Sequence, residues 1–409
     1  MLNNPFTPSE IASAPDDFFG RTKELSEAKR SLATGSVSIQ GQIGIGKSSL
    51  LARTRLEMEG FQSINTAKSV VAVGHKDILT ADDLARVLLE DMIEVDEKHK
   101  KVVFKLGGFI EVESNEIYRN YVSGRHTSAL LRLLEVEYLN QKRAGRELLI
   151  IAIDEADKCP TAIARLIRQI TTIAQHNGMK GIRFLLAGAA PYYKQMLAED
   201  AGIGRFIHRT IPLGPMNREE ATDLVETKLS LVTVDAANNK IKLSVDQSLV
   251  QRIVNLSGGH PHLLQLLGSY LIENENDDPD SALDARDLTS ALRRICYINR
   301  AQVYDSILHN LQVEGKLDDL RKLLSMAPAR FPTQIPQDDA MKAVSSQTLQ
   351  WMFDNNVLSI NSKKSYRLFD EFLRIRLVMD GTEEADQLNE IEQRLLEASW
   401  TIPMEQDLL

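Results

Sequence analysis

The chain has 409 residues, of which 43% are hydrophobic and 26% charged, and its formal net charge is −9 at pH 7. This composition is typical of a globular protein of about two to four domains, and the acidic balance argues against a nucleic-acid-binding surface over the whole molecule. No apolar run approaches the roughly 20 residues of a membrane helix, the N-terminus lacks a secretion signal, and the two cysteines have no metal-ligand spacing. We therefore expect a cytoplasmic protein that does not contact membranes.

The first predicted elements are an arm over residues 1–17, a helix that opens at Phe18-Phe-Gly-Arg-Thr-Lys-Glu24, and a short strand at 36–40. The next segment, Gly41-Gln-Ile-Gly-Ile-Gly-Lys-Ser-Ser49, fits the phosphate-binding loop pattern and leads into a helix. Its glycines let backbone N–H groups point at phosphates, Lys47 adds a mobile positive charge, and the Ser48 hydroxyl is suited to Mg²⁺. The pattern also arises by chance, but the strand and helix around it favour a nucleotide site. The predicted contacts are Gly41, Ile43, Gly44, Ile45, Gly46, Lys47, Ser48 and Ser49.

Strands and helices alternate after this loop. The spacing predicts a strand at 68–73, a helix at 81–97, a hairpin insertion at 101–112 that turns at Gly107-Gly108, and a helix at 127–141. Apolar runs predict strands at 148–153 and 182–187, and a short last strand covers 210–213. Strands separated by helices, with the ligand loop at their carboxyl ends, predict a doubly wound parallel α/β core over residues 18–216.

Two carboxylates, Asp154 and Glu155, directly follow the apolar run at 148–153. An aspartate at the end of a buried strand beside a phosphate loop can hold Mg²⁺ through water, and the next glutamate can orient and deprotonate the attacking water. The alternative is that the pair merely ends a strand and caps a helix. The presence of both carboxylates favours hydrolysis over binding alone.

Arg205 and Arg209 lie close to the start of the last predicted strand. A cation there can reach the γ-phosphate in a neighbouring subunit and stabilise the charge of the transition state. Either arginine can equally be a solvated or ion-paired surface residue, and the sequence does not choose between the two.

The second half of the chain is mostly helical. The pattern predicts an all-α lid at 217–298 and a winged-helix domain at 299–380, in which strands at 357–360 and 366–369 pair. Residues 381–409 contain eight acidic residues and one basic residue. Helical spacing at 383–399 indicates a solvated capping helix, or else a partner-docking or autoinhibitory element. In Ser257-Gly-Gly-His-Pro-His262, we interpret the histidines as packing or capping residues, because no third metal ligand lies nearby.

The order of these motifs resembles that of the AAA+/STAND P-loop ATPases, in particular the archaeal-ATPase-like and origin-initiator-like groups, over residues 18–380. The resemblance implies Arg205 or Arg209 as a finger acting on a neighbouring subunit. It also implies adenine contacts from Phe18, Phe19, Gly20, Arg21 and Pro261, Mg²⁺ binding by Ser48 and Asp154, and activation of water by Glu155. Two departures from the origin-initiator pattern favour the STAND group. The strand at 182–187 continues into Gly188-Ala-Ala190 without a polar γ-phosphate sensor, and Pro261 stands where initiators place an arginine.

We therefore predict a molecular switch that binds and hydrolyses ATP with Mg²⁺ and couples its nucleotide state to partner binding or self-assembly, for instance in defence or mobile-element control. The expected partners are a protein effector and further copies of the chain. The alternative is a DNA-associated AAA+ ATPase of the initiator, loader or transposition-regulator kind. Residues 301–380 carry ten basic and ten acidic residues, and the stretch 345–352 has no Lys or Arg, so DNA binding is less favoured. A degenerate scaffold is disfavoured because Lys47 and both carboxylates are intact.

Overall fold

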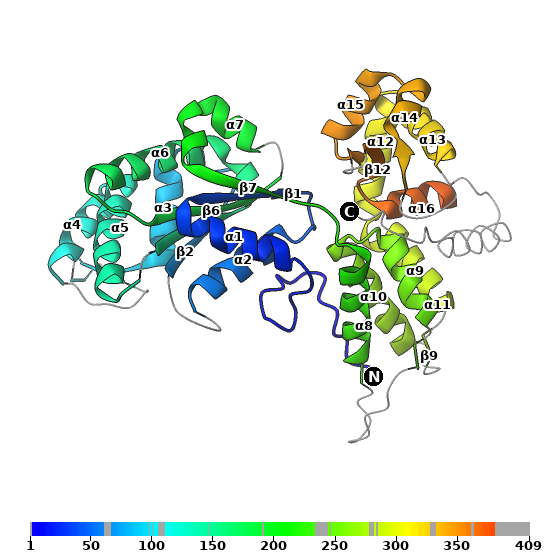
Figure 1. Cartoon of the computed structure of the whole chain (residues 1–409), viewed down its shortest axis with the longest axis horizontal. Coiled ribbons are helices and arrows are strands. Elements are labelled where there is room, and N and C mark those ends of the chain that lie inside the picture. The colour runs from blue at the N-terminus through cyan, green and yellow to red at the C-terminus, as the bar shows by residue number, and fades with distance from the viewer. Residues whose placement is uncertain are drawn as a thin grey trace. The chain divides into compact units, whose positions relative to one another are not determined.

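The structure is a computed structural model that describes residues 2–60, 67–96, 98–99, 101–104, 111–146, 148–189, 192–233, 244–245, 247–277, 282–283, 285–327, 333–360 and 364–380. The chain divides into two compact units (Figure 1): residues 11–214, the core unit, and residues 1–10 with 215–409, the helical unit. The predicted helix at 383–399 and the Gly107-Gly108 turn lie outside the described residues. Within the described ranges, every helix is too short or too polar to span a bilayer.

The core unit is built on a five-stranded parallel sheet in the order β2-β5-β6-β1-β7. Its strands are β1 (Ser36–Gly41), β2 (Ala67–Val73), β5 (Leu148–Asp154), β6 (Ile182–Gly188) and β7 (Ile207–Leu213). Along β5, Leu149 and Ile151 belong to one apolar core, whereas Leu148 and Ile150 belong to the other. Because side chains alternate between the two faces, a strand covered on both sides has the continuous apolar sequence seen here. The predicted α/β fold class is confirmed.

Helices cover both faces of this sheet (Figure 1). One face packs against α1 (Thr22–Thr34) and α2 (Lys47–Met58), and the other face packs against a larger set of helices. The larger set comprises α3 (Ala81–Met92), α5 (His126–Arg143) and α6 (Pro160–His176), with α4 (Glu111–Val122) beside α5 and α7 (Tyr192–Glu199) beside α6. Two short 3-10 turns, η1 (Ala156–Lys158) and η2 (Ala201–Arg205), follow β5 and precede β7. Because helices cover both faces, ligands can reach the sheet only at the ends of its strands. We call the side where the strands end the carboxyl edge and the side where they begin the amino edge.

The hairpin of the core unit differs from the prediction. It pairs β3 (Ile93–Asp96) with β4 (Lys101–Phe104), and Ile93 lies opposite Phe104. The predicted hairpin at 101–112 is therefore wrong in its pairing, since the chain is helical again from Glu111. The predicted helix at 81–97 is too long, because residues 93–96 alternate Ile and Val with acidic residues, a pattern that favours a strand.

The helical unit begins with a bundle of four helices onto which the start of the chain packs. The helices are α8 (Arg218–Ser230), α9 (Gln247–Ser257), α10 (Pro261–Asp277) and α11 (Ala285–Arg294), with a two-strand contact between β8 (Ser244–Val245) and β9 (Ala282–Leu283). Phe6 is 3% exposed and lies over Gly268, where an added Cβ would come within 2.3 Å of the ring. The Asn4 amide donates to the Ser269 hydroxyl at 2.8 Å. A glycine inside α10 therefore makes room for the N-terminal segment.

The remainder of the helical unit combines helices with a three-stranded antiparallel sheet. A π-helical turn, η3 (Ile295–Asn299), leads into α12 (Ala301–Val313), α13 (Leu317–Met326), α14 (Gln337–Ala343) and α15 (Ser346–Asp354). The sheet has the order β10 (Ile335–Pro336), β12 (Ser365–Leu368), β11 (Leu358–Ile360), and α16 (Glu371–Asp380) follows it. Leu358 lies opposite Leu368, so the predicted pairing of these two segments is confirmed.

Candidate nucleotide site

The phosphate-binding loop runs from the end of β1 to the start of α2. Gly44 and Gly46 have positive φ angles of 76° and 94°, and Gly46 is the N-cap of α2. Within the described chain, no side chain caps the first N–H groups of this helix. These groups lack intrahelical partners, and the helix dipole adds about half a positive charge at this end. The loop and the helix together present N–H groups suited to a polyphosphate.

Lys47, the first residue of α2, lies in the field of three carboxylates. Its ammonium donates to the Gln42 carbonyl at 2.6 Å, within the same loop. Burial lowers the pKa of Lys47, and the carboxylates of Asp157, Asp154 and Glu155 oppose this shift. The carboxyl ends of β1 and β5 therefore bring a cation and several anions to one edge of the sheet, as the sequence predicted for Lys47, Asp154 and Glu155.

The donor set fits Mg²⁺ bound together with a triphosphate. No group of three His, Cys, Asp or Glu side chains in the described part of the chain is arranged to hold a metal by itself. Mg²⁺ commonly takes only one or two carboxylates from a protein and completes its shell with water and substrate phosphates. Ser48 in the first turn of α2 and Asp154 at the end of β5 offer such oxygen ligands.

The backbone at Glu155 is held in an unusual conformation. Its φ angle is 47°, in the left-handed region, which costs a residue other than glycine roughly 1–3 kcal/mol. The end of β2 approaches closely here, since Gly74 N–H donates to the Asp154 carbonyl at 2.8 Å. A Cβ on Gly74 would lie 2.3 Å from the Glu155 carbonyl oxygen. The neighbouring strand therefore fixes the turn that carries Glu155, whose side chain is exposed at the sheet edge.

Asp157, in η1, is a site residue that the sequence analysis missed. Its carboxylate accepts from the Ala189 N–H at 2.9 Å, directly after β6. A Cβ on Gly188 would lie 2.9 Å from the Asp157 nitrogen and 3.1 Å from its carboxylate oxygen. Asp157 therefore fills the space beside Gly188, at the end of β6, where the family resemblance implies a polar γ-phosphate sensor. The sequence feature that could have revealed this residue is its position, since Asp157 is an acidic residue three positions after Asp154.

The segment from Phe18 to Arg21 lies beside the phosphate loop. Arg21 is 6% exposed, and its guanidinium donates to the carbonyl of Ile45 at 3.3 Å and to that of Gly214. Phe18 packs against the apolar core that includes Ile45. The structure brings this segment to the loop, and Arg21 acts on the loop through its buried guanidinium. Adenine contacts from Phe18, Phe19, Gly20 and Arg21 stay a prediction.

The two arginines predicted as fingers lie away from the loop within the core unit. Arg205 ends η2 and Arg209 lies in β7 opposite Val37, both toward the amino edge of the parallel sheet. The phosphate loop follows the carboxyl end of β1, and Gly41 lies four residues, or about 13 Å of strand, beyond the level of Arg209. Arg209 is ion-paired with Glu27. Pro261 is the first residue of α10 in the helical unit, and its contact with a base stays a prediction.

A family model described as Novel STAND NTPase 1 matches residues 9–290, well over half of the chain. The chain belongs to this family. The novel STAND NTPase is thus a P-loop NTPase, and the resemblance stated from its motifs is confirmed. No curated protein matches its sequence.

Solved structures share the fold of this STAND NTPase at low sequence identity. A Walker-type ATPase of Pyrococcus abyssi is 14% identical with a TM-score of 0.55, over 91% of this chain and 99% of that one. The ORC2 protein of Aeropyrum pernix, in ADPNP–ADP complexes, is 12% identical with a TM-score of 0.54, over 96% and 97%. At such identities the similarity establishes the fold alone, and it extends across both units of the chain.

Proposed function

We propose that this chain is an ATP-hydrolysing switch of the AAA+/STAND kind. The observation that carries the proposal is the carboxyl edge of the core sheet, where Lys47 and the N-terminus of α2 face Asp154 and Glu155. The N–H groups of the loop and Lys47 bind the phosphates. Ser48 and Asp154 would hold Mg²⁺, which neutralises charge on the phosphates when bound.

Hydrolysis requires a base and a group that stabilises the transition state. Glu155 is exposed beside Lys47 and accepts a proton from the attacking water. Arg205 or Arg209 of a second copy supplies positive charge to the γ-phosphate, because each lies on the opposite edge of its own sheet. The catalytic site is thus completed by self-assembly.

The change of nucleotide state reaches the rest of the chain through Arg21. This buried side chain joins the phosphate loop at Ile45 to Gly214, the last residue of the core unit. A loop that moves on phosphate release alters these hydrogen bonds and hence the start of the connection to the helical unit. Differential contacts of this kind are what allow a nucleotide to shift a conformational equilibrium.

The alternative function, a DNA-associated ATPase, rests on the winged-helix-like part of the helical unit. The helix that would enter the major groove of DNA is α15, and it contains no Lys or Arg to attract the phosphates of the DNA backbone. A switch that acts on protein partners or on its own assembly is favoured.

The decisive experiment is the ATPase rate per chain as a function of protein concentration, with and without duplex DNA. A rate that rises with concentration supports a site shared between copies. A constant rate at all concentrations would contradict the trans arginine, and stimulation by DNA would favour the alternative function.

A further inference from the structure

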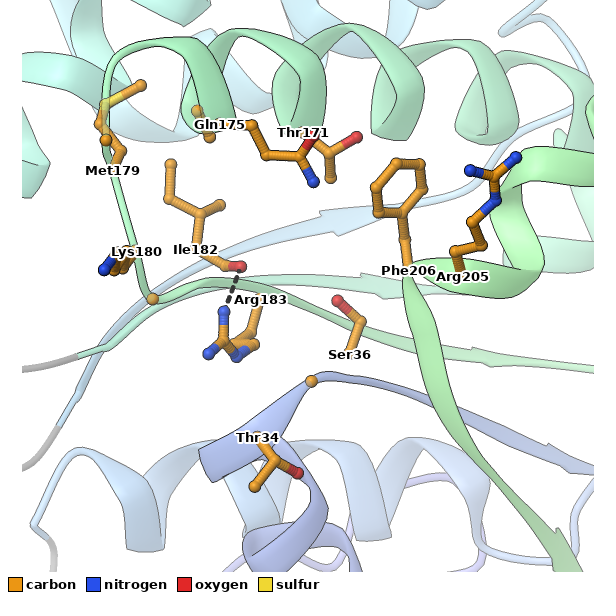
Figure 2. Close-up of a pocket in the computed structure, with 14 residues that line it drawn as sticks. Thr34, Ser36, Thr171, Gln175, Met179, Lys180, Ile182, Arg183, Arg205 and Phe206 are labelled. Carbon is orange, nitrogen blue, oxygen red and sulfur yellow. Dashed lines mark hydrogen bonds between the residues drawn. The ribbon is translucent and has the colours of Figure 1, made fainter.

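A hollow opens at the amino edge of the core sheet, opposite the phosphate loop. Its volume is about 500 Å³, within the range of small-molecule sites. Ser36 begins β1, Ile182 begins β6 and Phe206 immediately precedes β7, so three adjacent strands start at its wall. In Figure 2, Lys180 and Arg205 lie at opposite ends of the hollow.

Positive charge lines this hollow without an acidic partner. Lys180, Arg183 and Arg205 line it, and none of the lining residues is acidic among those that the structure describes. Two helices, α1 and α6, end here, and each helix end carries about half a negative charge. The helix ends therefore offset only about one of the three positive charges. An excess of about two charges remains, on a chain whose net charge is −9.

Among these cations, Arg183 gives the strongest indication of an anion site. A half-buried arginine on a central strand normally forms an ion pair with a carboxylate. Its Nε donates to the Leu32 carbonyl at 3.2 Å and one Nη to the Ile182 carbonyl at 3.1 Å. The first of these bonds caps the end of α1, the second stays within β6, and other N–H groups of the guanidinium remain available. Burial lowers the pKa of Arg183, and no carboxylate in the described chain opposes the shift.

The hollow also offers uncharged polar groups and an apolar wall. Ser36 is 4% exposed, and its hydroxyl accepts from the Phe184 N–H at 2.9 Å while its proton remains free to be donated. The Gln175 amide has no partner within the described chain and lies on the α6 side (Figure 2). Ile182 and Phe206 supply apolar contact.

We propose that this hollow binds a small organic anion, with a carboxylate or phosphate head held by Arg183 and Lys180 and an apolar body against Ile182 and Phe206. This ligand needs no metal, in contrast to a nucleotide at the carboxyl edge. Its binding does not require ATP to be hydrolysed.

The test uses phenyl phosphate as the probe and the full chain carrying Lys47→Ala, which disables the phosphate loop. Calorimetric titration is expected to show one saturable site per chain. Inorganic phosphate should bind more weakly because it lacks the apolar body, phenol should not saturate because it lacks charge, and benzoate tests whether a carboxylate head suffices. Absence of saturable binding by both phenyl phosphate and benzoate would overturn the proposal.

Matched variants locate the site. Arg183→Met should weaken binding at least about tenfold, as expected for one lost charge-assisted hydrogen bond. Should this variant fail to fold by circular dichroism, the exposed variant Lys180→Met, which removes the other proposed contact of the anionic head, carries the test with the same expected loss. Lys142→Met, an exposed lysine in the last turn of α5, is the control and should bind as well as the parent. Equal affinity in the control and in the pocket variants would show that the probe binds elsewhere, and the proposal would fail.

Discussion

The two edges of the core sheet place opposite kinds of chemistry on the same strands. At the carboxyl edge, the carboxylates of Asp157, Asp154 and Glu155 act electrostatically on Lys47, the first residue of α2. At the amino edge, Lys180, Arg183 and Arg205 line a hollow to which no described acidic residue contributes. A ligand that brings its own divalent cation needs both signs of charge, whereas a bare anion needs only positive charge. This difference is the basis of our two proposals, a metal-bound triphosphate at the carboxyl edge and a metal-free small anion in the hollow at the amino edge.

The largest expected effect comes from removing the lysine of the carboxyl edge. Lys47→Ala deletes the cation on which these carboxylates act and which we propose to bind the phosphates, so we expect ATP binding to fall below detection by fluorescence titration. Lys142→Ala, which removes an exposed lysine from α5, should leave ATP affinity unchanged. Comparable ATP affinity in the two variants would contradict the proposal that Lys47 binds ATP at the carboxyl edge.

The next effect tests the cations of the amino edge. Arg205→Ala should lower kcat for phosphate release by about 10³-fold while ATP affinity is kept, as expected for a transition-state arginine supplied by another copy. Arg209→Ala should have less effect, because Arg209 is already paired with Glu27. Mixing Arg205→Ala with Lys47→Ala should restore activity in assemblies where one copy contributes the arginine and the other the site. No recovery at any mixing ratio would argue against a shared site.

Glu155→Gln should keep ATP bound and lower turnover by about 10²-fold or more, because the amide cannot accept the proton of water. Quench-flow measurement of bound ATP and released phosphate separates the two steps. Unchanged phosphate release would remove Glu155 from the role of base.

A smaller effect is expected at Asp157. Asp157→Asn retains an oxygen that can accept from the Ala189 N–H but loses the charge that acts on Lys47. We expect kcat to fall by about tenfold, the effect of roughly 1.4 kcal/mol, with ATP affinity changed little. A kcat equal to the parent's would mean that Asp157 acts only through its hydrogen bond at the end of β6.

The smallest effect concerns stability. Glu155→Gly relieves the left-handed backbone and should raise the free energy of unfolding of the core unit by about 1 kcal/mol. Urea denaturation checks this, with Glu155→Gln as the control that keeps a side chain at the strained position. A gain in both variants would assign the effect to lost charge and not to the backbone.

The sequence predicted the carboxyl edge well because its signals are local. The run at 148–153 forms β5, and Asp154 directly ends it, so the strand and the predicted metal-binding residue are adjacent in the chain. The hairpin was mispredicted because alternation at 101–104 does not reveal its partner, which lies upstream at 93–96. Asp157 was missed because its meaning depends on contact with Gly188, a residue of another strand.

The hollow at the amino edge could not be predicted from the sequence, because it also depends on contacts between distant segments. Arg183 sits within an apolar run, and nothing in its neighbours shows that it meets the end of α1 at Leu32. The hollow arises only where the starts of three strands and the ends of two helices converge, and no short segment contains that information.

A crystal structure of Glu155→Gln soaked with ATP and Mg²⁺ tests the central claim most directly. We predict electron density for the γ-phosphate between Lys47 and Asp154, with the metal ion beside Ser48. A triphosphate bound instead in the hollow beside Arg183, or an empty phosphate loop at saturating ATP, would contradict the account.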